Sequence, residues 1–460
     1  MRQVLLSIIV AGLLSASCSS PDAAPETGPT IDGEAATSPV RSQLGWFLSA
    51  FNADGPPTIG EVEANISDVF LQQVPPELFI TSTIDFLSTY ELPFRVVEAA
   101  EPGVEGLELE ALLESVDGQQ LILSMTVTSD EPHMIETLLI QPGETPEFPA
   151  DATIESIDES LSGLAANSSL GLYDVTEGRC DPVHEIRPED PIVLGSAFKL
   201  WVLAELAYRV STGDASWDET FAVRDELKSS PDGQIYPMEA GTEVSLQEYA
   251  ELMISISDNS ATDHLIARLQ RSDVEAAIRR IGVSDPSANT PLMSTAALFQ
   301  LKYLASDPNA AEYRTLDEAN KRRILDQIDD TILPSELDSE NAEGVAVDQP
   351  RNLDLEWFAT PHDMCLTMVH LDEFAVTPGL EPVAGILEMN PGAGIPFRRD
   401  HWPTIRFKGG SEAGVLAGVW WFENPLGRRY VLAGGLNDPN STIDEPTAIF
   451  TLASTITLVE

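Results

Sequence analysis

A short stretch near the middle of the chain, Pro191 to Leu200, places a serine three residues before a lysine. Its apolar and small residues predict a turn that runs into a helix, with Ser196 and Lys199 on one helical face. A serine hydroxyl is a poor nucleophile at neutral pH and needs a neighbouring base. A lysine amine can be that base when burial or a nearby cation lowers its pKa. The pair therefore predicts a nucleophile and its base at the start of a helix.

Strand-like and helical segments around this pair predict one large α+β domain over residues 149–460. Two alternating segments come first, and the stretch from 246 to 337 has helical periodicity. Three more strand-like segments and a closing helix follow. The expected strands are 164–175, 180–186, 405–407, 415–422 and 429–436, and the expected closing helix is 444–458. Strands from both ends of the domain would then bracket a helical middle.

Two more motifs follow the Ser196 stretch in a fixed order. Ser257-Asp258-Asn259 ends a helical segment, and Lys408-Gly409-Gly410 opens the terminal strands and is followed by Ser411. S-x-x-K, S-D-N and a K-[ST]-G-like element in this order resemble the motifs of class A β-lactamases and penicillin-binding proteins. The resemblance covers about residues 164–460, and it implies an antiparallel sheet flanked by helices. It departs at Gly409, where that family carries a hydroxyl.

The resemblance also implies a role for each motif residue. Ser196 would attack a carbonyl and become acylated, with Lys199 as the base. Lys408 would lower the pKa of Lys199 by its like charge, and Ser257 would relay a proton to the leaving group. The backbone N–H groups of Ser196 and Ser411 would form the oxyanion hole. The residues expected to contact substrate are Asn259, Gly410 and Ser411, while Asp258 braces its turn.

Other departures bear on the activity. The stretch 287–297, where class A β-lactamases would carry the glutamate that activates the deacylating water, contains no carboxylate, and Asp285 is the nearest. The strand 415–422 has no arginine to bind a β-lactam carboxylate. Arg406 lies on the same strand face as Lys408 and is the substitute we expect.

These observations predict a β-lactamase-related serine hydrolase that hydrolyses β-lactams slowly or acts as an esterase. One alternative is a penicillin-binding-protein-like carboxypeptidase or acyltransferase acting on cell-wall peptides. Another is a catalytically silent cell-surface binding lipoprotein. The expected partner is thus a small-molecule or peptide acyl substrate, whether a β-lactam, an ester or a cell-wall peptide.

The N-terminus predicts export. Arg2 precedes an apolar run over residues 4–14, which is too short for a comfortable membrane span. The small residues that end in Cys18 resemble a bacterial lipoprotein signal. We therefore expect a signal peptide over 1–17, lipidation of Cys18 and a disordered, proline-rich linker over 18–39. The protein would be a cell-membrane lipoprotein that faces the extracytoplasmic side.

Residues 40–148 predict a small, separate α+β domain. Three short helical segments precede four strand-like ones, divided by turn signals such as Pro102-Gly103 and Asp117-Gly118. This order resembles the cone of ketosteroid-isomerase-like proteins. The two-domain arrangement also resembles the β-lactamase-like proteins of β-lactam biosynthesis clusters. A non-catalytic partner domain is the expected role.

Composition excludes some functions. The chain has 75 acidic and 25 basic residues, a formal net charge of −50, which should repel nucleic acid. Its six histidines show no paired Cys/His spacing, so we expect neither a metal site nor a cofactor. Cys180 and Cys365 are expected to be two separate buried thiols, although export would permit a disulfide. The oligomeric state stays open.

Overall fold

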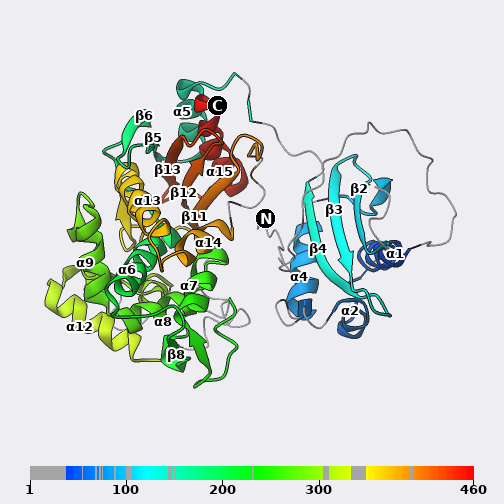
Figure 1. Cartoon of the computed structure of the whole chain (residues 1–460), viewed down its shortest axis with the longest axis horizontal. Helices are drawn as coiled ribbons and strands as arrows, with labels where there is room; N and C mark the ends of the chain where they lie inside the picture. Colours follow the sequence, from blue (N-terminus) through cyan, green and yellow to red (C-terminus); the bar gives the residue numbers. More distant parts are fainter. Residues whose placement is uncertain are drawn as a thin grey trace. The chain divides into compact units, whose positions relative to one another are not determined.

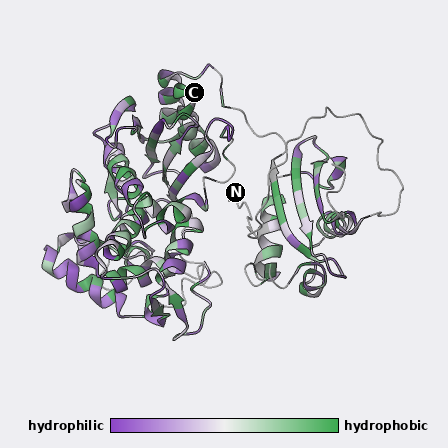
Figure 2. Cartoon of the chain, in the orientation of Figure 1, coloured by the Kyte–Doolittle hydropathy of each residue, from purple (hydrophilic) through white to green (hydrophobic). Residues whose placement is uncertain are grey.

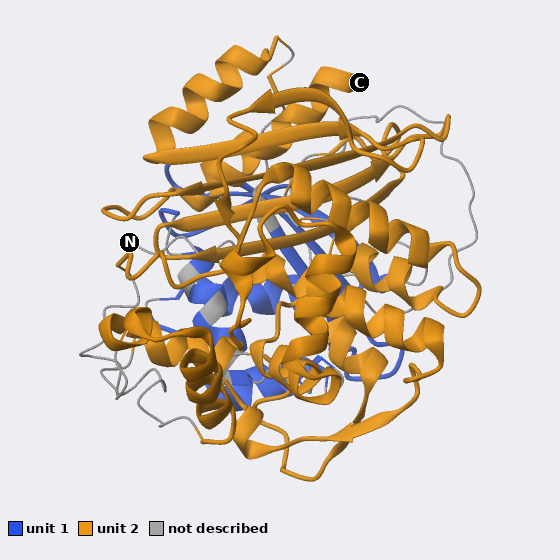
Figure 3. Cartoon of the chain, turned by 90° about the vertical axis from the view of Figure 1, so that its left-hand side faces the viewer, with its two compact units in different colours: residues 1–147 blue, residues 148–460 orange. Residues whose placement is uncertain are grey.

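A computed structural model describes most of the chain. The described residues are 38–53, 55–67, 70–71, 74, 76–87, 90–99, 106–142, 148–149, 151–229, 233–303, 310–332, 349–390, 392, 395 and 397–460. The chain divides into two compact units, 1–147 and 148–460 (Figure 3). The expected signal peptide, Cys18 and most of the expected linker lie outside the described residues, so they stay predictions.

Unit 1 consists of helices followed by an antiparallel meander (Figure 1). Every second residue of its two central strands is buried, as expected for a sheet with one covered face. The strands lie in the order β1-β2-β3-β4. The elements are α1 (Pro39–Phe51), α2 (Ile59–Asn65), α4 (Pro76–Leu87), β1 (Arg95–Ala99), β2 (Glu108–Glu114), β3 (Gln120–Val127) and β4 (Ile135–Pro142). The predicted element order is confirmed, and the ketosteroid-isomerase-like cone stays a prediction.

Unit 2 has a five-stranded antiparallel sheet made from both ends of its sequence, in the order β11-β12-β13-β5-β6. This confirms the predicted α+β fold. The strands are β5 (Asn167–Asp174), β6 (Asp181–Ile186), β11 (Thr404–Glu412), β12 (Val415–Glu423) and β13 (Arg429–Asn437). β11 is an edge strand and runs five residues past its predicted end at Phe407. Its pairing with β12 is unbroken from Thr404 to Glu412, so the two weak strand formers Gly409 and Gly410 lie within the sheet.

Helices cover both faces of this sheet. The α5–α15 pair packs on one face and the larger helical part on the other (Figure 3). The central helix α6 (Lys199–Thr212) is buried along its first nine residues, whereas α9 and α12 show hydrophilic outer sides (Figure 2). The other helices are α5 (Ile154–Leu164), α7 (Leu246–Ser255), α8 (Asn259–Leu269), α9 (Arg271–Ile281), α10 (Thr295–Tyr303), α11 (Ala310–Thr315), α12 (Glu318–Asp329), α13 (Pro361–Ala375), α14 (Pro382–Glu388) and α15 (Glu445–Ser454). Within the described ranges, none is both long and apolar enough to cross a membrane.

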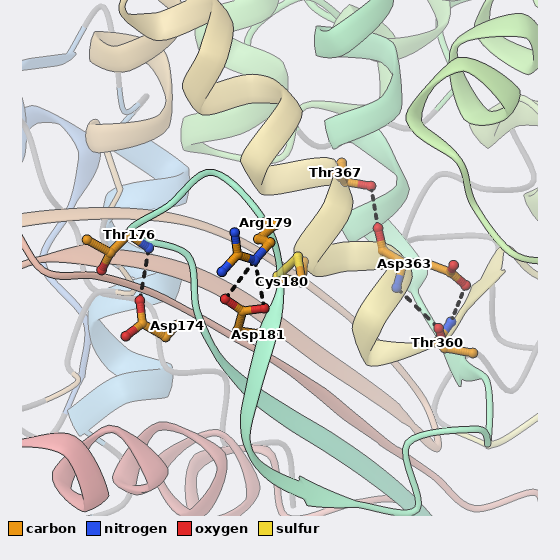
Figure 4. The surroundings of a disulfide bond; sticks show 9 residues. Asp174, Thr176, Arg179, Cys180, Asp181, Thr360, Asp363 and Thr367 are labelled. Carbon is orange, nitrogen blue, oxygen red and sulfur yellow. Dashed lines mark hydrogen bonds and ion pairs between the residues drawn. A yellow bond between two sulfur atoms is a disulfide. The ribbon is translucent and has the colours of Figure 1, made fainter.

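Cys180 and Cys365 form a disulfide, so the expectation of two separate thiols is wrong (Figure 4). The two residues are 185 positions apart in sequence, and their Cα atoms are 6.2 Å apart in the fold. Cys180 precedes β6 directly and Cys365 lies in the first turns of α13, where Thr360 and Asp363 form a capping box. Packing of α13 on the sheet brings the two thiols together, and no local sequence pattern signals it.

Candidate active site

The Ser196 stretch is a tight turn that leads into the central helix. Strand β7 (Ile192–Val193) pairs with β10 (Phe358–Ala359), and a 3₁₀ turn, Gly195–Phe198, then runs directly into α6. Among residues 192–200, Ser196 alone is partly exposed. In a 3₁₀ turn residues i and i+3 lie above one another. Ser196 is thus partly accessible at this turn, and Lys199, one turn further on, begins α6 with its side chain buried.

Lys199 joins the first motif to the second. Its side chain is fully buried. Its Nζ donates to the Ser257 carbonyl oxygen at 2.6 Å, to Ser257 Oγ at 3.1 Å and to Asn259 Oδ1 at 2.8 Å. These three acceptors are uncharged oxygens.

Lys408, from the third motif, contacts the second motif at Ser257. Its Nζ donates to Ser257 Oγ at 3.0 Å and to the Gly409 carbonyl oxygen at 2.6 Å. The Ser257 hydroxyl thus lies between the two lysine amines. Burial, and then the positive charge of Lys199, hold the pKa of Lys408 well below that of a free lysine. A hydroxyl between two amines that repel each other is suited to proton transfer.

The Ser257 turn is strained and braced. Ser257 has φ +63°, in the left-handed region that non-glycine residues rarely adopt. The buried Asp258 carboxylate accepts from Gln234 N at 2.7 Å, Ile235 N at 3.0 Å and Ala261 N at 2.8 Å. The last of these bonds caps α8. Such strain persists only where the surrounding structure holds it, and Asp258 lies where a brace was predicted.

The backbone of β11 lies directly against the nucleophile turn. A Cβ atom added at Gly410 would overlap Leu194 O and Ser196 N and would lie 2.8 Å from Ala197 N. A Cβ added at Gly195 would lie 3.3 Å from Ser411 N. Only glycine fits at position 410, and this close approach brings the Ser196 and Ser411 amides together. An oxyanion hole requires two amides that point at one oxygen atom, and this is the role proposed for these two amides below.

Ser411 turns its side chain away from the site. Its hydroxyl is hydrogen-bonded to the Glu445 carboxyl, at the start of α15 on the other face of the sheet. Burial raises the pKa of Glu445, and the Ser411 hydroxyl opposes that change. Alternation along a strand explains the split, since Lys408 and Gly410 face the helices of the site. The backbone of Ser411 thus lies beside the nucleophile turn, while its side chain points to the other face of the sheet.

Gly409 and Arg406 show how the third motif departs from the family pattern. A Cβ at Gly409 would lie 2.7 Å from Cζ of Phe407, whose ring stacks on Trp420. A hydroxyl-bearing residue at 409 would therefore require Phe407 to move.

The expectation that Arg406 replaces the missing carboxylate ligand is wrong. Its side chain is 9% exposed and donates to Asp372 Oδ1 at 2.6 Å and Glu388 Oε1 at 3.0 Å, so its charge is already neutralised.

The stretch expected to carry a deacylating carboxylate has structural contacts instead. Asp285 accepts from Ser287 N at 3.1 Å and caps a short turn. Asn289 donates to Phe358 O at 2.8 Å and accepts from Phe358 N at 2.9 Å. Neither side chain is directed at the Ser196 turn by these bonds. In the described ranges no cluster of His, Cys, Asp and Glu could hold a metal ion.

Sequence reasoning missed a second group of polar residues near the site. Lys302 pairs with Glu356 and Glu412, and Glu412 directly follows Ser411. Trp357, next to Glu356, stacks on Phe198 with ring centroids 3.7 Å apart. The only signal in the sequence was the scarcity of lysine, of which the chain has five.

A helix-flanked antiparallel sheet with Ser196, two lysines and an S-D-N turn meeting at its edge strand defines a protein of the β-lactamase and penicillin-binding-protein class. The model of the β-lactamase enzyme family matches residues 153–456. This match spans more than half of the chain, so the protein belongs to that family. Residues 35–132 match the model of the N-terminal region of the ORF 12 gene product. A search of curated proteins gave no match.

Solved structures of β-lactamases and of PBP-A are similar to this chain at low sequence identity. A β-lactamase from Sphaerobacter thermophilus is 17% identical, with TM-score 0.46, over 67% of this chain and 99% of that one. A β-lactamase from Chitinophaga pinensis is 13% identical, with TM-score 0.45, over 66% and 97%. PBP-A is 16% identical, with TM-score 0.43, over 66% and 93%.

Proposed function

We propose that this protein is a serine hydrolase that forms an acyl-enzyme at Ser196. The observation that carries the proposal is the convergence of three motifs, far apart in sequence, on one hydroxyl between two lysines. Lys199 and Lys408 both donate to Ser257 Oγ, at 3.1 and 3.0 Å. A purely structural site has little use for two buried amines that share one acceptor, because each costs desolvation energy.

We assign one group to each step of acylation. Ser196 Oγ attacks the substrate carbonyl carbon and gives its proton to the Lys199 amine, which acts as the base. The carbonyl oxygen becomes an oxyanion that accepts from the Ser196 and Ser411 amides. Ser257 Oγ then gives its proton to the leaving nitrogen or oxygen and regains one from a lysine. The bond to the leaving group breaks, and the acyl group stays on Ser196.

Deacylation is the step that we propose to be slow for β-lactams. A water must attack the acyl carbonyl, and stretch 287–297 offers it no carboxylate base. Ser257 and its two lysines remain able to take the proton of that water. We therefore propose slow β-lactam turnover or esterase activity, with the carboxypeptidase and the silent binding protein as the outcomes against which this is tested.

The test is to incubate the purified protein with a fluorescent penicillin and follow its intact mass, with Ser196→Ala as the control. An adduct on the parent alone supports Ser196 as the nucleophile. A persistent adduct supports slow deacylation, whereas a transient one with product would show that another base replaces the glutamate. If penicillin leaves no adduct, a fluorophosphonate probe separates an esterase, which it labels, from a silent binding protein, which it does not.

We also propose that the protein is an exported lipoprotein anchored at Cys18. The disulfide in unit 2 supports export, since disulfides persist in oxidising compartments. Metabolic labelling with a fatty acid should mark the parent and leave Cys18→Ala unlabelled and released from the membrane fraction. Equal labelling of both proteins would contradict the anchor.

A further inference from the structure

The missed polar group is a buried cluster at the end of β11. Lys302, near the end of α10, donates to Glu356 Oε1 at 2.6 Å and to Glu412 Oε1. The Tyr303 hydroxyl donates to Glu412 Oε2 at 3.0 Å. The side chains of Lys302 and Glu356 are fully buried, and that of Glu412 is 15% exposed. Glu412 is thus held by two donors from one helix.

This cluster connects the elements that carry the three motifs. Glu412 follows Ser411, whose amide is the second oxyanion donor of the proposed mechanism. Glu356 precedes Trp357, whose carbonyl oxygen accepts from Leu194 N at 2.9 Å, just before the nucleophile turn. At the other end of α10, Thr295 Oγ1 donates to the Asn259 carbonyl oxygen at 3.2 Å. Nine residues of helix, about 13 Å at 1.5 Å per residue, therefore join the S-D-N turn to the end of β11.

The charges within the cluster balance if the two carboxyls share one proton. Burial raises the pKa of Glu356, and the charge of Glu412 adds to this, while Lys302 opposes it. One ammonium, one carboxylate and one carboxylic acid then leave no net charge inside. Removing Glu412 alone would leave Lys302 with Glu356 as a balanced buried pair. That variant is therefore the one that folding should tolerate best.

We propose that Glu412 is a positioning residue that fixes the Ser411 amide for catalysis through its bonds to Lys302 and Tyr303. The inference rests on the acyl-enzyme function proposed above. β11 is an edge strand, so β12 supports it from one side only, and Glu412 is its last residue. The end of an edge strand frays easily without an anchor. An oxyanion donor works only when it is held at the right place before the reaction.

The test measures acylation of Glu412→Ala by a fluorescent penicillin at a series of concentrations. This separates the affinity of the first complex from the rate constant of acylation. We expect the rate constant to fall about tenfold or more, because the oxyanion forms only after binding, while affinity stays within about twofold. Glu412→Gln should keep most of the rate, since its amide can accept from Lys302 and donate to Tyr303.

Glu423→Ala is the matched control, because Glu423 ends β12 beside the opposite end of β11. It should acylate at the parental rate. If Glu412→Ala does not fold, as judged by circular dichroism, Tyr303→Phe removes one of the two donors to Glu412 without changing the charge of the cluster and should show a smaller loss of the same rate constant. A folded variant that acylates at the parental rate overturns the inference. A parent that takes no acyl group would instead overturn the proposed function on which it rests.

Discussion

Two buried lysine centres meet β11, one at Lys408 and one at Glu412, and they differ in their acceptors. Lys199 and Lys408 donate to hydroxyl, amide and carbonyl oxygens. Lys302 instead donates to two carboxyls. A lysine beside a carboxylate keeps its proton, whereas a lysine beside another lysine gives its proton up more easily. In the functions proposed above, the same side chain serves proton transfer in one centre and strand anchoring in the other.

The largest effect should follow the substitution Lys199→Met. Without the base, we expect the acylation rate to fall about a thousandfold. The free energy of unfolding should change by only about 1 kcal/mol, because relief of the repulsion from Lys408 offsets the lost hydrogen bonds. Penicillin labelling and denaturant unfolding measure the two quantities. A variant that is still acylated at a tenth of the parental rate would show that Lys199 is not the base.

Lys302→Met should have the opposite pattern, with a large loss of stability and a smaller loss of acylation rate. It leaves the buried Glu356 and Glu412 carboxyls facing each other, and removing one partner of a buried ion pair costs about 3–5 kcal/mol. We expect the free energy of unfolding to fall by that amount. The folded protein should still be acylated at Ser196, at a rate reduced as much as in Glu412→Ala. Lys321→Met on α12 is the control for removing one lysine. A loss below about 1 kcal/mol would remove the distinction between the two centres.

The difference between the two lysine centres also explains which of them could be predicted from the sequence. Lys199 and Lys408 belong to short motifs, because their chemistry needs neighbours at a fixed local spacing. Lys302 meets partners 54 and 110 positions away, and no local pattern encodes that meeting. The Cys180–Cys365 disulfide was missed for the same reason. β11 was predicted too short because Gly409 and Gly410 weaken the strand pattern, and the close approach to Ser196 requires glycine at position 410.

Reducing the disulfide should lower stability without changing either centre. The bond joins the start of β6 to α13, and a disulfide typically contributes about 2–4 kcal/mol by restricting the unfolded chain. Unfolding should therefore occur at lower denaturant concentration with reductant, or in the variant Cys180→Ala, Cys365→Ala. Acylation of the folded protein should stay at the parental rate. A reduced rate would show that the disulfide also holds the site.

The smallest expected effect is on how the free energy of unfolding depends on pH, and it comes from Lys408. The pKa of Lys408 in the fold lies well below that of a free lysine. Between these two values the unfolded chain binds more protons than the folded one, so stability contributed by this residue rises with pH across that window. Below the folded pKa the full cost of burying the charged amine is present. Lys408→Met removes this cost.

The stability gain of Lys408→Met over the parent should therefore be largest near neutral pH and should shrink as pH rises toward the usual lysine range. Denaturant unfolding of both proteins across that range measures the difference, and the titrating groups that do not interact with Lys408 cancel in it. Lys321→Met controls for the loss of one positive charge. A gain that stays constant with pH would mean that the two amines at Ser257 do not compete for protons, and the contrast with Lys302 would then rest on geometry alone.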